Sequence, residues 1–306
     1  MYNRICMIIN GVIGDIYGAP IEMLPCEYIH ERWDSIMTTY ICTDKMQERP
    51  YTYTDDTEMT IAVLDFLSDV KSNKCEKNQE TMLKYFSKHF APFRGYSSNT
   101  SKIFLDYIET GIIKTGTSNA NGGLMRVSPI AFLCNYNDDE SILNLINIIH
   151  YPTHIYEEAI HTSYIYIKIL LRFYELRESK NKKQDIFSFL KELHDICKYH
   201  IKNIILMILN EHDNDEYEML DNFIGLDGIL CYETLGTALW CIVKNIDDDP
   251  KKILARGIFY GGDTDTIGSL IGQMTGMLFG LNAINPEWMS HVENIDYIME
   301  LSHNLL

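Results

Sequence analysis

Basic residues are scarce in this chain. Among its 306 residues, 26 lysines and arginines stand against 43 aspartates and glutamates, which gives a formal net charge of -17 at pH 7. A surface with that excess of negative charge repels the phosphates of nucleic acids and of anionic membranes. We therefore expect neither direct nucleic-acid binding nor a membrane partner.

Paired cysteines and long apolar runs are also missing. The eight cysteines show no Cys-x-x-Cys spacing, so we expect reduced, mostly buried thiols in a soluble intracellular protein, with a cytoplasmic location. Asn10, Gly11 and Asp15 interrupt or end the N-terminal apolar run. That interruption argues against a signal peptide and against a membrane span.

Short alternating segments with hairpin turns are absent too, and helical patterns dominate. We predict an all-α fold, a compact orthogonal multi-helix bundle with a dinuclear metal cleft, in which residues 1–306 form a single domain. Surface loops are expected at 177–185 and 211–221. Helices are expected over 138–149, 153–176, 188–209, 226–244, 250–260 and 267–281.

Two acidic segments far apart in the chain each open a predicted helix. The first, Thr54-Asp55-Asp56-Thr57, is by itself equally well explained as an ordinary helix cap. The second, Gly261-Gly262-Asp263-Thr264-Asp265-Thr266, adds a glycine pair that lets the backbone turn sharply. Clustered acids repel one another unless a cation neutralises them. Together the segments offer hard oxygen ligands that suit two Mg²⁺ or Mn²⁺ ions.

Other motifs leave two interpretations open. The stretch from Ser118 to Arg126 contains Asn-Gly-Gly, which is typical of a turn but also of a loop that cradles a phosphate. Arg126 fits either a phosphate contact or a buried ion pair. Asp15, inside an apolar helical run, needs a partner and would bind a motif loop or support the metals. Glu22 is either a loop acid or a functional one, and His150 ends an apolar helix, where a histidine is usually structural.

With these motifs in order, the chain resembles the ADP-ribosylglycohydrolases, which include dinitrogenase reductase-activating glycohydrolases and ADP-ribosyl-acceptor hydrolases. The matching pieces run almost from end to end and keep the family's order and spacing. They are Gly14-Asp15 through Glu22, Thr54 through Thr57, Arg94-Gly95-Tyr96, Asn121 through Arg126, and Gly261 through Thr266, extended by Gly272, Gly276 and Gly280.

The resemblance implies a set of site residues. As metal ligands it implies Thr54, Asp55, Asp56, Asp263, Asp265 and Thr266. As substrate-binding residues it implies Ser118, Asn121, Gly122, Gly123 and His150. Glu22 matches an acid on a mobile loop in the branch that cleaves O-linked ADP-ribose, and Arg94-Gly95-Tyr96 leans the same way. Asn119 and Ala120 depart from that branch, which has a tyrosine and a glycine there.

The implied activity is hydrolysis of ADP-ribose from modified protein side chains, with ADP-ribosylated proteins as partners and ADP-ribose as ligand or product. Two ions would hold the ribose hydroxyls and a water. Asp263 or Asp265 would take the proton of that water, with Glu22 as the rival for acid–base work. The alternatives are a non-catalytic ADP-ribose-binding or structural protein on the same fold, and a dinuclear phosphohydrolase. The latter usually mixes histidine with aspartate, and neither acidic segment contains histidine.

Overall fold

The structure is a computed structural model that describes residues 2–33, 52–211, 228–290 and 292–306. Within these ranges there are helices and loops but no strand, and two isolated β-bridges join Thr117 to His154 and Ala120 to Leu230. The all-α prediction is confirmed. The α-helices are α1 (Tyr2–Gly18), α2 (Cys26–Glu31), α4 (Asp55–Lys71), α5 (Gln79–His89), α6 (Ser98–Thr110), α7 (Asp139–His150), α8 (Glu157–Leu176), α9 (Lys182–Ile196), α10 (Tyr199–Glu211), α12 (Cys231–Lys244), α13 (Pro250–Ile258), α14 (Thr264–Phe279), α15 (Pro286–Ser290) and α16 (Ile295–Asn304).

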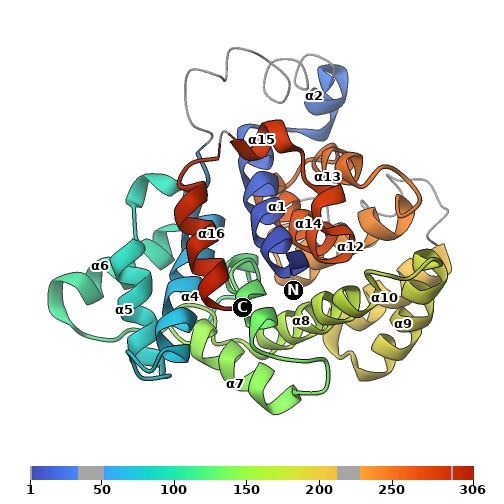
Figure 1. Cartoon of the computed structure of the whole chain (residues 1–306). Coiled ribbons are helices and arrows are strands. Elements are labelled where there is room, and N and C mark those ends of the chain that lie inside the picture. Colours follow the sequence, from blue (N-terminus) through green and yellow to red (C-terminus); the bar gives the residue numbers. More distant parts are fainter. Residues whose placement is uncertain (1, 34–51, 212–227, 291) are drawn as a thin grey trace.

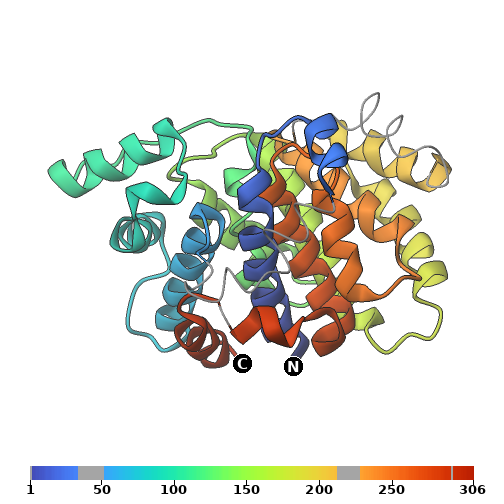
Figure 2. The same cartoon turned by 90° about the horizontal axis from the view of Figure 1, so that it is seen from above.

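Two helices from opposite ends of the sequence, α1 and α14, lie side by side at the centre of the molecule (Figures 1 and 2). In Figure 1, α4, α5, α6 and α16 flank this pair on one side, and α12 and α13 on the other. Nearly all of α1 and α14 is buried. Apolar burial contributes roughly 25 cal/mol per Å², so the packing of α1 against α14 stabilises the centre of the molecule.

Glycine makes the close approach of α1 and α14 possible. A Cβ added to Gly14 would lie 2.0 Å from the backbone oxygen of Gly268, and one added to Gly272 would lie 2.0 Å from that of Asn10. A Cβ on Gly18 would meet the Thr264 oxygen at the same distance. Because these contacts are with backbone, a side chain could fit only if the helices moved apart. The glycines therefore bring the C-terminal end of α1 against the start of α14.

Several predicted helices are confirmed with shifted ends, and two predictions are wrong. The expected single helix over 188–209 is two helices, α9 and α10, separated at Cys197 and Lys198, with Tyr199 at a φ of 56°. The loop expected at 177–185 is shorter, because α9 already begins at Lys182. Most of the loop expected at 211–221, and the start of the helix expected from 226, lie outside the described residues.

The N-terminal helix is the one described segment whose length and hydropathy would allow a membrane span. In that segment, Tyr2–Ile21, 83% of the 18-residue apolar window is buried within the protein, as expected of a core helix. Six of the cysteines are described as free thiols, in line with the expectation from their spacing: Cys6, Cys75, Cys134, Cys197, Cys231 and Cys241.

Candidate active site

The first acidic segment forms the start of α4. Thr54 caps the helix, its side chain accepting a hydrogen bond from the Asp56 backbone N–H at 3.3 Å. Asp15 of α1 holds this turn from below: its carboxylate accepts hydrogen bonds from the Thr54 N–H at 3.1 Å and from the Thr57 hydroxyl at 2.5 Å. The sequence left Asp15 either to bind a motif loop or to support the metals, and the structure shows its contact with the Thr54–Thr57 motif.

The second acidic segment forms the start of α14. Gly261 and Gly262 both have left-handed backbone conformations, with φ of 81° and 77°, which only glycine adopts without strain. The turn delivers Asp263 to the N-cap position and Asp265 to the first turn of the helix. The Thr264 hydroxyl donates to the Gly18 carbonyl at 2.8 Å, so the turn is fastened to the end of α1.

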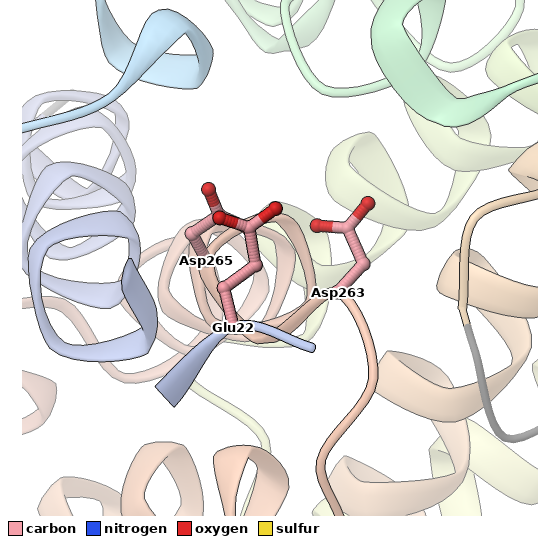
Figure 3. A group of neighbouring side chains, drawn as sticks. All are labelled: Glu22, Asp263 and Asp265. Atoms are coloured by element: carbon pink, nitrogen blue, oxygen red, sulfur yellow. The ribbon is translucent and has the colours of Figure 1, made fainter. Parts of the chain in front are cut away.

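The two acidic segments meet. The Thr266 hydroxyl donates to Asp56 Oδ2 at 3.2 Å, which joins the start of α14 to the start of α4. Glu22, which follows α1, comes to the same place because the Met23 N–H donates to the Gly262 carbonyl at 2.9 Å. Carboxylate oxygens of Glu22, Asp263 and Asp265 all lie within 4.8 Å of one another, and Figure 3 shows the three groups converging.

We call Glu22, Asp55, Asp56, Asp263 and Asp265 the acidic cluster. Burial, followed by repulsion from neighbouring carboxylates, raises the pKa of Asp55 to about 8 and the pKa values of Asp56 and Asp265 well above the usual value. Burial also raises the pKa of Glu22, with the charges of Asp263 and Asp15 adding to the effect. None of the ion pairs in the described residues includes a member of the cluster. The cluster is therefore a group of acids without an ion-pair partner in the described residues.

The acidic cluster opens into a cavity of about 750 Å³, a size typical of small-molecule sites. Of the residues predicted from the sequence, Thr54, Gly123 and His150 are not part of its lining. Those that line it are Glu22, Asp55, Asp56, Ser118, Asn121, Gly122, Asp263, Asp265 and Thr266.

The predicted substrate loop divides into two kinds of residue. Ser118 accepts a hydrogen bond from the Ala120 N–H at 3.1 Å, and its own proton has no acceptor among the described residues. Asn121 instead turns to the acidic cluster, where its amide donates to Asp263 Oδ2 at 2.7 Å. Asn119 is also held by protein, since its amide donates to Glu158 at 3.0 Å. Asn121 thus fixes the orientation of Asp263, a role that spacing alone did not suggest.

His150, the last residue of α7, and His154, four residues later, are placed differently from one another. His150, the predicted one, is fully buried behind Gly123 and contacts Ser163. His154, which we did not single out, lines the cavity beside Gly122. The sequence pattern does not distinguish the two histidines, because they are four residues apart and only the turn between them decides which one faces the cavity.

Arg94-Gly95-Tyr96 reaches the cavity through its glycine. Arg94 forms a pair of 2.8 Å hydrogen bonds with Glu293, and Tyr96 donates to Glu58 of α4 at 2.7 Å. Gly95 between them has a φ of 95°, and a Cβ there would lie 3.5 Å from Asp55 Oδ1. The flanking residues therefore hold a bare stretch of backbone against the acidic cluster.

Fold and site together define an all-α protein with a carboxylate-rich ligand cavity. The chain belongs to the ADP-ribosylglycohydrolase family, whose family model matches residues 4–306. This makes it an enzyme of the glycosyl hydrolase class that acts on ADP-ribosyl bonds.

Similar proteins agree with this assignment. An uncharacterized Escherichia coli protein, YegU, is 24% identical, over 94% of this chain and 90% of its own. The zebrafish (Danio rerio) ADP-ribosylhydrolase ARH3 is 20% identical, over 97% and 88%. A solved structure described as an ADP-ribosylglycohydrolase-related protein complex shares the fold, with a TM-score of 0.69, 18% identity and coverage of 99% of this chain and 96% of that one.

Proposed function

We propose that this enzyme removes ADP-ribose from modified protein side chains, using two divalent cations, Mg²⁺ or Mn²⁺, and that residues 1–306 act as one domain. The observation that carries the proposal is the hydrogen bond from Thr266 to Asp56. It brings two acidic helix starts from distant parts of the chain to one end of the cavity. We call this end, formed by the acidic cluster and Thr266, the floor. We expect the protein to act inside the cell, where its free thiols would persist.

The residues of the floor fit a pair of divalent cations. One buried oxygen, Asp56 Oδ1, has no hydrogen-bond partner in the described residues, and a buried carboxylate oxygen without a partner is costly. All the donors are carboxylate or hydroxyl oxygens, the kind that Mg²⁺ and Mn²⁺ prefer. When bound, such ions supply Lewis acidity and lower the pKa of an attached water. The residues that would hold them are Thr54, Asp55, Asp56, Asp263, Asp265 and Thr266.

The chain's own groups would carry out the remaining steps. A carboxylate of Asp263 or Asp265 would accept the proton of the attacking water. Asn121 fixes Asp263 by donating to its Oδ2. Glu22 is exposed on the loop after α1, and its carboxylate lies within 4.8 Å of those of Asp263 and Asp265. It is the second candidate for proton transfer, either from the water or to the leaving oxygen or nitrogen. Ser118 and Gly122, which line the cavity, would position the diphosphate, and Gly123 and His150 would support them from behind.

Defined substrates would test the function directly. The protein is incubated with Ser-linked and Arg-linked ADP-ribosyl peptides in Mg²⁺ or Mn²⁺, and released ADP-ribose is measured by mass spectrometry. We expect release from at least one peptide and none from an Asp56→Ala control with an unchanged helical CD spectrum. Binding of ADP-ribose without release from either peptide would contradict a hydrolase and favour a non-catalytic ADP-ribose-binding protein.

A further inference from the structure

His154 is a cavity residue to which no role has been assigned above. Its ring packs against Gly122, where an added Cβ would lie 2.9 Å from the ring Cε1 and 3.0 Å from Nε2. The side chain is only 4% exposed, yet it belongs to the cavity lining. Nε2 has no hydrogen-bond partner among the described residues, whereas Nδ1 lies 2.6 Å from the Thr153 hydroxyl. The free ring nitrogen is therefore the one beside the glycine turn.

A short chain of hydrogen bonds decides which ring nitrogen carries the proton. Arg126 is always a donor, and its Nη2 donates to Thr153 Oγ1 at 2.7 Å. The Thr153 hydroxyl thus accepts from Arg126, and His154 Nδ1 is the one acceptor that the described residues offer to its single proton. A neutral imidazole that accepts at Nδ1 carries its proton on Nε2. We assign His154 to the Nε2–H form, a hydrogen-bond donor beside Gly122.

The same surroundings keep the ring neutral. Burial, and then the charge of Arg126, hold the pKa of His154 well below its ordinary value. Arg126 itself is fully buried, donates to the Ile149 carbonyl at 2.9 Å and lies over the Phe86 ring. It forms no ion pair in the described residues, although the charge of Asp55 acts on it. Burial lowers the pKa of Arg126 to about 9, so it stays charged at neutral pH.

His150 gives an internal comparison. Its Nδ1 lies 3.2 Å from the backbone oxygen of His154, and its Nε2 lies 2.9 Å from the Ser163 hydroxyl. Because a carbonyl oxygen only accepts, Nδ1 must carry the proton of His150. The two neighbouring histidines are thus held in opposite tautomers, and only the tautomer of His154 has its donor at the cavity.

We propose that Arg126, Thr153 and His154 form a relay that presents the His154 Nε2–H as a donor to a phosphoryl oxygen of the substrate's diphosphate. The proposal rests on the function proposed above. An anion is the expected partner because the cavity wall formed by Gly122, Arg126, Thr153 and His154 carries the charge of Arg126, which forms no ion pair in the described residues. The acidic cluster would repel a diphosphate from the floor, so the diphosphate should lie against this wall. His154 is then a binding residue, and Thr153 and Arg126 are positioning residues.

Two measurements test the relay separately from the function. Nitrogen NMR of ¹⁵N-histidine-labelled protein distinguishes protonated from unprotonated ring nitrogens, and loss of a signal in His154→Gln assigns it. We expect the Nε2–H form for His154, the Nδ1–H form for His150, and a shift of the His154 tautomer ratio in the isosteric Thr153→Val. An Nδ1–H form of His154 in the parent would overturn the relay, whatever the enzyme does.

Calorimetry with ADP-ribose in Mg²⁺ tests the donor. We expect His154→Ala to weaken binding about 10- to 150-fold, as for a lost hydrogen bond to a charged group. His154→Gln, whose amide replaces the Nε2–H, should recover most of the affinity, and His303→Ala, at an exposed histidine of α16, should change nothing. Equal affinity in His154→Ala and the parent would overturn the donor role alone. A parent that does not bind ADP-ribose would instead overturn the proposed function, and the role of His154 with it.

Discussion

The floor and one wall of the same cavity bury charge in opposite ways. In the described residues, no ion pair joins the acidic cluster to a protein cation, and none joins Arg126, buried behind His154, to a protein anion. Each arrangement alone is unfavourable, because a buried charge needs a partner. This difference supports the proposed function, in which cations would bind at the floor and an anion would lie against the wall. A substrate with metal-binding hydroxyls at one end and a diphosphate beyond them would satisfy both.

Breaking the floor should have the largest effect. In the isosteric Asp56→Asn, or after metal removal with EDTA, we expect kcat to fall by about 10²–10³-fold or more, because charge stabilisation in the transition state is lost. Asp65→Asn is the matched control: it lies on the same helix, but its carboxylate pairs with Lys88 and His89 away from the cavity. Steady-state release of ADP-ribose measures both. Full activity after exhaustive EDTA treatment would show that the floor needs no cation.

Replacing Glu22 tests whether its carboxylate transfers a proton in the reaction. Glu22→Gln keeps the shape and removes the charge, so kcat should fall by roughly 10²–10⁴-fold while ADP-ribose affinity stays nearly unchanged. Single-turnover kinetics and calorimetry separate the two quantities, with Glu27→Gln on the exposed face of α2 as the control. If Glu22→Gln turns over substrate like the parent, Glu22 is only a loop acid and proton transfer belongs to Asp263 or Asp265.

Ser118 tests the anion-binding side. Its hydroxyl has a proton to donate, so Ser118→Ala should weaken ADP-ribose binding by about 1–3 kcal/mol, with a smaller effect on kcat. Calorimetry measures the change, and Ser188→Ala, whose hydroxyl bonds only within α9 in the described structure, is the control. An effect on kcat with unchanged binding would place Ser118 with the floor and not with the wall.

The smallest effect concerns stability without metal. The folded-state pKa values of Asp15 and Asp55 are raised to about 6 and about 8, mainly by burial. Groups with raised pKa bind more protons when folded than when unfolded, so stability falls as pH rises from about 4 to 8. In EDTA we expect the melting temperature to drop by a few degrees between pH 5 and 8. Asp55→Asn should flatten this dependence. A melting temperature that rises over this range would contradict the raised pKa values of Asp15 and Asp55.

Local chemistry predicted much of the floor. Capping and the needs of a glycine turn are decided by a few adjacent residues, so the starts of α4 and α14 could be read directly. That the two starts share one cavity also followed, because neighbouring carboxylates call for common cations. The break at Cys197 could not be predicted, since the apolar pattern of 188–209 continues through it and contains neither proline nor glycine.

The sequence by itself determined the helical class, the acidic segments, the family resemblance and the glycines that suit a close helix contact, because each depends on short-range spacing or residue type. Only the tertiary structure decided which side chains face the cavity. Asn121 turns to Asp263, Asp15 holds the start of α4, and His154 takes the wall while His150 is buried. These orientations depend on contacts between segments that are distant in the sequence, and on the turn after α7. At that turn, His150 and His154 are only four residues apart along the chain, yet the first lies in the core and the second at the site.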